Sequence, residues 1–365
     1  MLRTKKGFWT LLIGLCVLSA AAGQESQDTV LQTEHQLFGL PLVYFTPETR
    51  WAFGLAGVVT TNWKNRTPRQ RPTQLQLGGA YTLNRQILLY LSYQLFLRDN
   101  RWQSYGELGY YRYNYFYFGT GNAFPDYEGE LFGVNFFRGR FNGLYQAFPN
   151  IYLGFRYQID DYQLTEFAED GLLEQETSLE AESGLISGLG LLAQYDNRDQ
   201  LFFPREGFFA EGLLLSNGRW LGSPFDFQKL ILDIRNYQPL GKRFVLATNV
   251  YAEFTRGRTP FYQLALLGGT RRMRGYYEGR FRDQHLLLAQ AEYRFPLFWR
   301  LKGTVFAGYG AVAPTLSSFQ TEHLRYTLGA GLRILINEAD QLHIRIDAGF
   351  GKNTSGYYLT IGEAF

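Results

Sequence analysis

Residues 342–350 read Leu342-His343-Ile344-Arg345-Ile346-Asp347-Ala348-Gly349-Phe350. Every second residue of this stretch is apolar, and the residues between them are polar, charged or glycine. Successive side chains of a β-strand point to opposite faces of a sheet, so the alternation predicts a strand with one apolar face. The pattern decides the fold because it recurs at 324–336, 287–295 and 74–83, whereas no segment of comparable length has a period of 3.6.

The length of the alternating runs favours a membrane-spanning barrel over a soluble β-sandwich, which is the alternative. Strands of soluble β-domains average about five or six residues, whereas about 9–11 alternating residues suit a tilted strand that crosses a bilayer. Backbone polar groups in lipid must all be paired, so such strands must close into a barrel. The dense tyrosines and phenylalanines of residues 110–118 match the aromatic girdles of such barrels. We therefore expect an all-β fold, namely a 16-stranded antiparallel transmembrane β-barrel.

The connections between the expected strands alternate in length. The sixteen strands are expected at 40–46, 50–62, 73–84, 85–98, 101–118, 130–142, 147–166, 184–197, 206–218, 225–239, 243–257, 284–297, 301–312, 323–336, 341–351 and 356–365. Long connections follow odd-numbered strands, and most connections after even-numbered strands are short, apart from the basic segment 63–72. Long extracellular loops and short periplasmic turns are typical of bacterial barrels, so residues 258–283 are the expected sixth extracellular loop.

Composition excludes several other classes of protein. The chain has 365 residues, of which 17% are aromatic, and a mean hydropathy of -0.23, too low for a bundle of transmembrane helices. The aromatic content is too high for a disordered chain. One cysteine rules out a disulfide framework, and four scattered histidines offer little for a zinc site, so we expect no metal and no cofactor.

The N-terminus has the features of a secretory signal peptide. Three basic residues precede an apolar run from Phe8 to Leu18, and small residues follow it, so we expect cleavage after residue 23; a membrane anchor is the alternative. Residues 24–36 are then a short periplasmic stub and residues 37–365 the barrel. Removing residues 1–23 takes away three of the 36 basic residues and leaves 33 against 33 acidic ones. A neutral chain gives no electrostatic argument for binding nucleic acid.

Three blocks of sequence resemble the signatures of one outer-membrane family. Residues 267–276 read Leu267-Gly268-Gly269-Thr270-Arg271-Arg272-Met273-Arg274-Gly275-Tyr276, which resembles the Gly-Gly…Arg-Gly-Phe/Tyr signature of the BamA/TamA outer-membrane superfamily. Residues 195–207 resemble its Asp-x-Arg-Asp…Phe-Pro-x-x-Gly turn, and residues 291–310 resemble the strands that follow its sixth loop. The resemblance covers residues 36–365 and implies a bacterial outer-membrane barrel with an inward-folded sixth extracellular loop.

The resemblance implies that Arg274 docks the sixth loop inside the lumen. The implied docking motif consists of Gly268, Gly269, Arg274, Gly275 and Tyr276. A guanidinium in a confined lumen needs carboxylate partners, and its five donors suit a bidentate one. Many members carry the receiving acid in a Phe-x-Asp-x-Gly strand, where this chain has Gly308. We therefore expect Glu292 or Asp347, both on the expected inward face, to replace it; an ordinary loop arginine is the alternative for Arg274.

Two further features concern the periplasmic side of the expected barrel. The turn between the eighth and ninth strands carries Asp196, Arg198, Asp199, Pro204 and Gly207. Alternating charges before a proline can fix a hairpin through local ion pairs, so we expect a structural role here, with substrate contact as the alternative. Phe365 ends an alternating terminal strand, which resembles the signal that delivers bacterial outer-membrane barrels to their assembly machinery.

The expected function follows from the resemblance. Well-characterised members carry periplasmic polypeptide-transport-associated repeats, and residues 24–36 do not fit one, so the chain resembles the short, barrel-only branch. Pro41 lacks the N–H of a ladder donor and would weaken pairing between the first and last strands. We expect a barrel, not an enzyme, that assists insertion or translocation of proteins or lipids by opening at this seam. Expected partners are outer-membrane lipids and other outer-membrane or periplasmic proteins; a structural barrel and a passive channel are the alternatives.

Overall fold

The computed structural model describes residues 34–46, 50–62, 70–122, 129–175, 182–338 and 340–365. Within these ranges sixteen strands form one antiparallel sheet, and their order in space follows their order in the chain. This confirms the expected all-β class and the sixteen-stranded antiparallel sheet. The expected signal peptide, residues 1–23, and most of the expected stub, residues 24–36, lie outside the described residues.

The strands of the large sheet are mostly longer than ten residues. They are β1 (Glu34–Thr46), β2 (Arg50–Asn62), β3 (Thr73–Thr82), β4 (Ile87–Leu97), β5 (Trp102–Tyr117), β6 (Glu130–Phe148), β7 (Ile151–Glu166), β8 (Gly184–Asp196), β9 (Gly207–Asn217), β10 (Phe227–Leu240), β11 (Phe244–Gly257), β14 (His285–Pro296), β15 (Leu301–Ala313), β16 (Arg325–Asn337), β17 (Leu342–Gly351) and β18 (Thr354–Ile361). Short helical segments lie in the connections, namely α1 (Leu172–Gln175), η1 (Arg219–Leu221), η2 (Phe261–Gln263), η3 (Leu316–Ser318) and η4 (Thr321–His323). No helix in the described ranges is long and apolar enough to cross a membrane.

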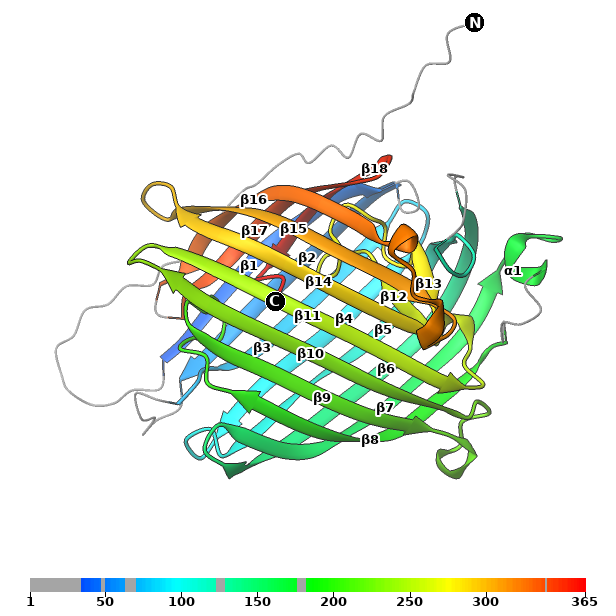
Figure 1. Cartoon of the computed structure of the whole chain (residues 1–365), viewed down its shortest axis with the longest axis horizontal. Coiled ribbons are helices and arrows are strands. Elements are labelled where there is room, and N and C mark those ends of the chain that lie inside the picture. The colour runs from blue at the N-terminus through cyan, green and yellow to red at the C-terminus, as the bar shows by residue number, and fades with distance from the viewer. Residues whose placement is uncertain (1–33, 47–49, 63–69, 123–128, 176–181, 339) are drawn as a thin grey trace, which may run out of the picture.

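Figure 1 shows the sheet curled into a barrel, with a small second sheet on its inner side. The second sheet pairs β12 (Ala265–Leu267) with β13 (Phe281–Asp283); β12 contacts β14 and β15, and β13 contacts β15. Both strands belong to the connection between β11 and β14. The expected sixth loop therefore has secondary structure of its own, which the sequence analysis did not anticipate.

The alternation of burial along each strand matches the alternation in the sequence. In β8, Leu189 and Leu191 point outward with exposed fractions of 42% and 69%, whereas Leu192 and Gln194 point inward and are buried. The outward face of the sheet is thus apolar, as a surface in contact with lipid must be. The inward face carries the polar and charged side chains that build the site.

The two ends of the sheet differ from the sequence-based boundaries. β1 begins at Glu34, inside the stretch expected as a stub, and β18 ends at Ile361 instead of residue 365. Gly362 has a φ of +83°, a left-handed conformation that ends the strand, and the residues after it turn inward. The expectation that Phe365 closes the terminal strand is therefore wrong in this respect.

Candidate functional site

The connection between β11 and β14, called the sixth loop below (residues 258–284), packs against the inner wall of the sheet. Its residues Leu267, Met273, Tyr276 and Phe281 form a buried apolar cluster with side chains of β11, β14 and β15. Burying each such side chain contributes about 1.5–3 kcal/mol, so the loop is held by its own hydrophobic core. The stretch between β12 and β13, residues 268–280, forms the tip of the loop and carries Arg274.

Arg274 lies between two carboxylates on the inner wall. Its Nη1 donates to Oδ2 of Asp347 on β17 at 2.5 Å, and its Nη2 donates to Oε1 of Glu292 on β14 at 2.5 Å. The guanidinium also stacks on the ring of Phe306, 3.6 Å from the ring centre. The structure thus brings the loop arginine together with both acids proposed from the sequence, because all three side chains point into the lumen.

Three further arginines surround these acids, and we call the whole set the arginine–carboxylate network. Its members are Arg274, Arg294, Arg333, Arg345, Glu292, Asp347 and Glu363. Arg333 bridges Asp347 at 2.6 Å and Glu363 at 2.7 Å, and Arg294 contacts Glu292 at 2.9 Å. All seven side chains are at most 3% exposed. Such buried charges are tolerated only when each has a partner, and here they link the loop to β14, β16, β17 and the residues after β18.

Gly275 allows the loop to approach the terminal strands closely. Its φ is +114°, and a Cβ there would lie 2.7 Å from the backbone nitrogen of Phe350. Its N–H donates to the Tyr358 hydroxyl at 2.9 Å, and its carbonyl accepts from Thr354 Oγ1 at 3.1 Å. Both partners lie on β18, so the backbone at Gly275 joins the loop to the last strand.

Neighbouring residues of the tip make further contacts with the inner wall. A Cβ at Gly308 would lie 3.1 Å from Met273 Sδ, so the missing acid leaves room for this apolar side chain. The Tyr276 hydroxyl donates to the Tyr326 carbonyl at 3.0 Å and accepts from the Lys352 N–H at 3.0 Å. Gly268 and Gly269 have φ values of +116° and +89° and form the turn before the arginines. The five residues of the expected docking motif therefore lie together on the inner wall.

The sequence matches one protein-family model over residues 65–365, described as the Omp85 superfamily domain. This match covers most of the chain. The chain belongs to the Omp85 superfamily. Membership and the fold together indicate an outer-membrane barrel of the protein translocation or insertion type. No curated protein matches the chain in sequence.

Solved Omp85 barrels share this fold at low sequence identity. BamA from Haemophilus ducreyi lacking POTRA domains 1-3 is 14% identical with a TM-score of 0.55, over 90% of this chain and 70% of that chain. CdiB from Escherichia coli is 12% identical with a TM-score of 0.59, over 90% of this chain and 61% of that chain. CdiB from Acinetobacter baumannii is 12% identical with a TM-score of 0.56, over 90% and 59%. The chain spans less than two thirds of both CdiB chains, and identities this low show the fold alone.

The turn between β8 and β9 of this Omp85 barrel is organised by Asp196. Its carboxylate accepts from Arg198 Nε at 2.9 Å and Nη2 at 2.8 Å, and from Arg71 Nη1 at 2.5 Å. Asp199 accepts from the backbone N–H of Arg205 at 3.0 Å. Arg71 belongs to the basic segment 63–72, of which residues 63–69 lie outside the described ranges. The ion pair between Arg71 and Asp196 joins this segment to the turn.

The rest of that turn reaches the inside of the Omp85 barrel. The Pro204 carbonyl accepts from Arg294 Nη1 at 3.5 Å, and Gly207 has a φ of +108° where β9 begins. Phe203 is buried, with Lys302 Nζ 3.9 Å from the centre of its ring. The turn therefore contacts the network, which sequence spacing did not reveal.

The C-terminal residues 362–365, called the tail below, also lie inside the Omp85 barrel. Phe365 is 5% exposed and packs with Ala364, Tyr237 and Ala247. Its backbone oxygen accepts from Arg294 Nη2 at 3.2 Å, and Glu363 pairs with Arg333. The tail is thus seated against the lumen wall at β10 and β11.

Sequence reasoning missed Arg333, Arg345, Glu363 and Tyr358 as members of this site. The signal was present, because Arg333 and Arg345 occupy inward positions of alternating strands, where an arginine requires a carboxylate. Their partners come from other strands and could not be assigned without the register. In the described ranges no three side chains of histidine, cysteine, aspartate or glutamate gather as metal ligands.

Proposed function

We propose that this Omp85 barrel assists the insertion or translocation of polypeptides, or of lipids, at the outer membrane by opening between its first and last strands, without a cofactor. The family supports the class of activity, and the arrangement of the terminal strands supports the route. The proposed partners are outer-membrane lipids and other outer-membrane or periplasmic proteins.

The observation that carries the proposal is the state of the two edge strands. β1 and β18 stand at opposite ends of the strand order, and within the described residues no register joins them. Unpaired strand edges attract other strands, since their N–H and C=O groups seek partners. β18 has only 8 residues, and Pro41 in β1 has no N–H to donate. A seam with few backbone hydrogen bonds costs little to open.

The sixth loop supports the same proposal from the inside. Thr354 and Tyr358 hold β18 to the backbone at Gly275, and Glu363 holds the tail to Arg333. These contacts keep β18 on β17 when β1 moves away. Opening the seam then breaks only a few hydrogen bonds and does not unfold β18.

Disulfide locking of the seam tests the proposal. Cys16 is the only native cysteine and lies in the expected leader, so engineered cysteines would be alone in the mature chain. Pairs placed between residues 38–42 and residues 355–361 are screened for oxidation, and locked variants are tested in cells that lack the native chain. We expect oxidised variants to fail to restore outer-membrane integrity and reduced ones to restore it.

A matched control cross-links strands that are already paired. Cysteines at Leu213 and Ile231, which are register partners on β9 and β10, leave the seam free and should permit function in both redox states. Full function of a folded, seam-locked barrel would contradict lateral opening and favour a structural or complex-forming role. A wide, stable pore in single-channel recordings would favour the passive channel.

A further inference from the structure

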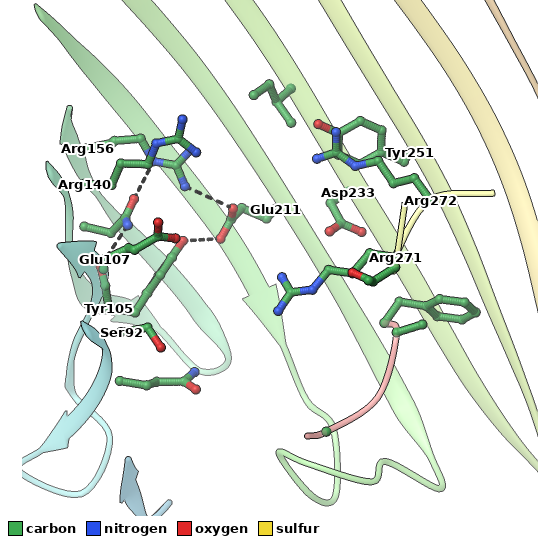
Figure 2. A pocket seen from close by; sticks show the side chains of 18 of the residues that line it. Ser92, Tyr105, Glu107, Arg140, Arg156, Glu211, Asp233, Tyr251, Arg271 and Arg272 are labelled. Carbon is green, nitrogen blue, oxygen red and sulfur yellow. Dashed lines mark hydrogen bonds and ion pairs between the residues drawn. The ribbon is translucent and has the colours of Figure 1, made fainter. Parts of the chain in front are cut away.

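Next to the arginine–carboxylate network the lumen contains a cavity of about 740 Å³. The tip of the sixth loop lines one side, with Arg271 and Arg272, and strands β3 to β9 line the other. Figure 2 shows Tyr105, Glu107, Arg140 and Arg156 facing the loop across this space. The volume is ample for a small molecule, since ligand pockets typically span about 300–1,000 Å³.

Arg271 projects into the cavity from a backbone that is held firmly. Its carbonyl accepts from Gln290 Nε2 at 2.9 Å, and the carbonyl of Thr270 accepts from Arg345 Nη2 at 3.0 Å. The side chain itself is exposed to the cavity and forms no ion pair with any residue in the described ranges. Arg271 thus differs from the arginines of the network, each of which contacts a carboxylate.

The loop side of the cavity carries an excess of positive charge. Its cations are Lys229, Arg235, Arg271 and Arg272, and its carboxylates are Asp233, Glu253 and Glu278. Asp233 is taken by Arg235 at 2.5 Å, and Glu253 is shared by Lys229 at 2.8 Å and Arg272 at 3.8 Å. Four cations against three carboxylates leave one positive charge in excess on this side.

The opposite wall does not supply the missing charge. Its groups balance one another: the cations are Arg138, Arg140 and Arg156, and the carboxylates are Glu107, Asp160 and Glu211. The Tyr105 hydroxyl donates to Glu211, so this carboxylate is engaged as well.

We propose that the Arg271 side of this cavity binds an oxyanion of the phosphate class. The planar guanidinium of Arg271 matches two oxygens of such an anion, and the excess positive charge of the loop side attracts it. Neutral amides of Gln74, Gln76 and Gln94 line the same cavity and offer hydrogen bonds to hydroxyl groups. The ligand is thus free phosphate or the phosphate ester of a small polyol, and both present the same charged group to Arg271. This site does not depend on seam opening.

Calorimetric titration of the purified full chain in a non-ionic detergent tests the proposal. The probes are inorganic phosphate and glucose 6-phosphate at constant ionic strength, with chloride as the reference anion. We expect saturable binding that Arg271→Gln weakens about tenfold or more, since a hydrogen-bonded charge contact is worth about 1.5–3 kcal/mol and 1.4 kcal/mol is tenfold. Tighter binding of glucose 6-phosphate assigns the ester, and equal binding assigns free phosphate.

The matched control is Arg219→Gln, which removes one positive charge from a side chain that is 79% exposed, outside the cavity. Its affinity should stay within about twofold of the native chain, as surface charges contribute little. Arg271→Lys keeps the charge but loses the fork and should bind with intermediate affinity. Absence of phosphate binding to the native chain, or equal weakening by Arg271→Gln and Arg219→Gln, would overturn the proposal. Heat-modifiable gel mobility of each variant verifies that the barrel is folded.

Discussion

At the scale of single residues, Arg274 connects the tip of the sixth loop to the wall of the barrel. Its charge is neutralised by Glu292 and Asp347, which lie on strands far apart in the sequence. Removing one partner of a buried ion pair costs about 3–5 kcal/mol because the remaining charges lose their compensation. Arg333 and Arg345 also contact Asp347, so part of this cost falls on the network as a whole.

We therefore predict that Arg274→Ala leaves the sheet formed but releases the tip of the sixth loop. Glu292 and Asp347 lose the arginine that binds both of them. The tip of the loop then leaves the inner wall, and water enters the arginine–carboxylate network. Limited proteolysis should cut residues 268–280 faster than in the native chain, and heat-modifiable mobility should still report a folded barrel. Arg219→Ala, on the exposed surface, is the control. A cleavage pattern identical to that of the native chain would contradict the docking of the loop through Arg274.

At the scale of elements, the tail is attached to the wall chiefly by one carboxylate and one aromatic ring. Glu363 contacts Arg333 Nε at 2.7 Å and lies 3.9 Å from Arg294, and Phe365 fills a buried position beside Tyr237. β18 ends at Ile361, and the tail joins the backbone of the sheet through the bond from the Gly362 N–H to the His343 carbonyl at 2.9 Å. Beyond Gly362, its position depends on the side-chain contacts of Glu363 and Phe365.

We predict that Glu363→Gln frees the tail. The amide cannot neutralise Arg333 and Arg294, so residues 362–365 should be removed faster by carboxypeptidase while β18 stays paired with β17. Glu322→Gln, at a side chain that is 75% exposed, is the matched control because it removes a carboxylate outside the network. Equal digestion rates for the two variants would show that Phe365 alone holds the tail.

At the scale of the whole molecule, the lumen of the barrel is occupied by its own chain. Sixteen strands can enclose an open aqueous channel, but here the sixth loop, the turn between β8 and β9 and the tail all lie against the inner wall. The cavity of about 740 Å³ is what these segments leave between them and strands β3 to β9. The lumen is therefore obstructed by the connections and the tail, and not by the strands of the sheet.

The native chain should accordingly show low conductance in planar bilayers. Replacing residues 269–278 by a short Gly-Ser linker removes the tip of the sixth loop and should raise the conductance several-fold, since ions then meet a wider lumen. A shortened connection 315–321, between β15 and β16, is the control for a loop that does not carry the docking motif. High and stable conductance of the native chain would contradict an occupied lumen.

The period-two alternation of residues such as those at 342–350 was sufficient to predict the class of fold and the number of strands in the sheet. Each inward and outward position is set locally by the geometry of a strand, so no tertiary information is needed. Sequence blocks around Arg274 and Asp196 likewise pointed to the family, which the match over residues 65–365 established. The exact strand ends were less predictable, because Gly362 and the inward contacts of Glu363 end β18.

The sequence by itself therefore determined an alternating, cysteine-poor, sixteen-stranded chain with a candidate docking arginine. Only the tertiary structure decided what that arginine contacts, which further charges join it, and which charge, Arg271, is left facing the cavity. The physical reason is that alternation depends on neighbours along one strand, whereas charge pairing in the lumen depends on the register of many strands and on the path of the loops. Those distances are set by how the strands and connections are arranged in space, and no local pattern encodes them.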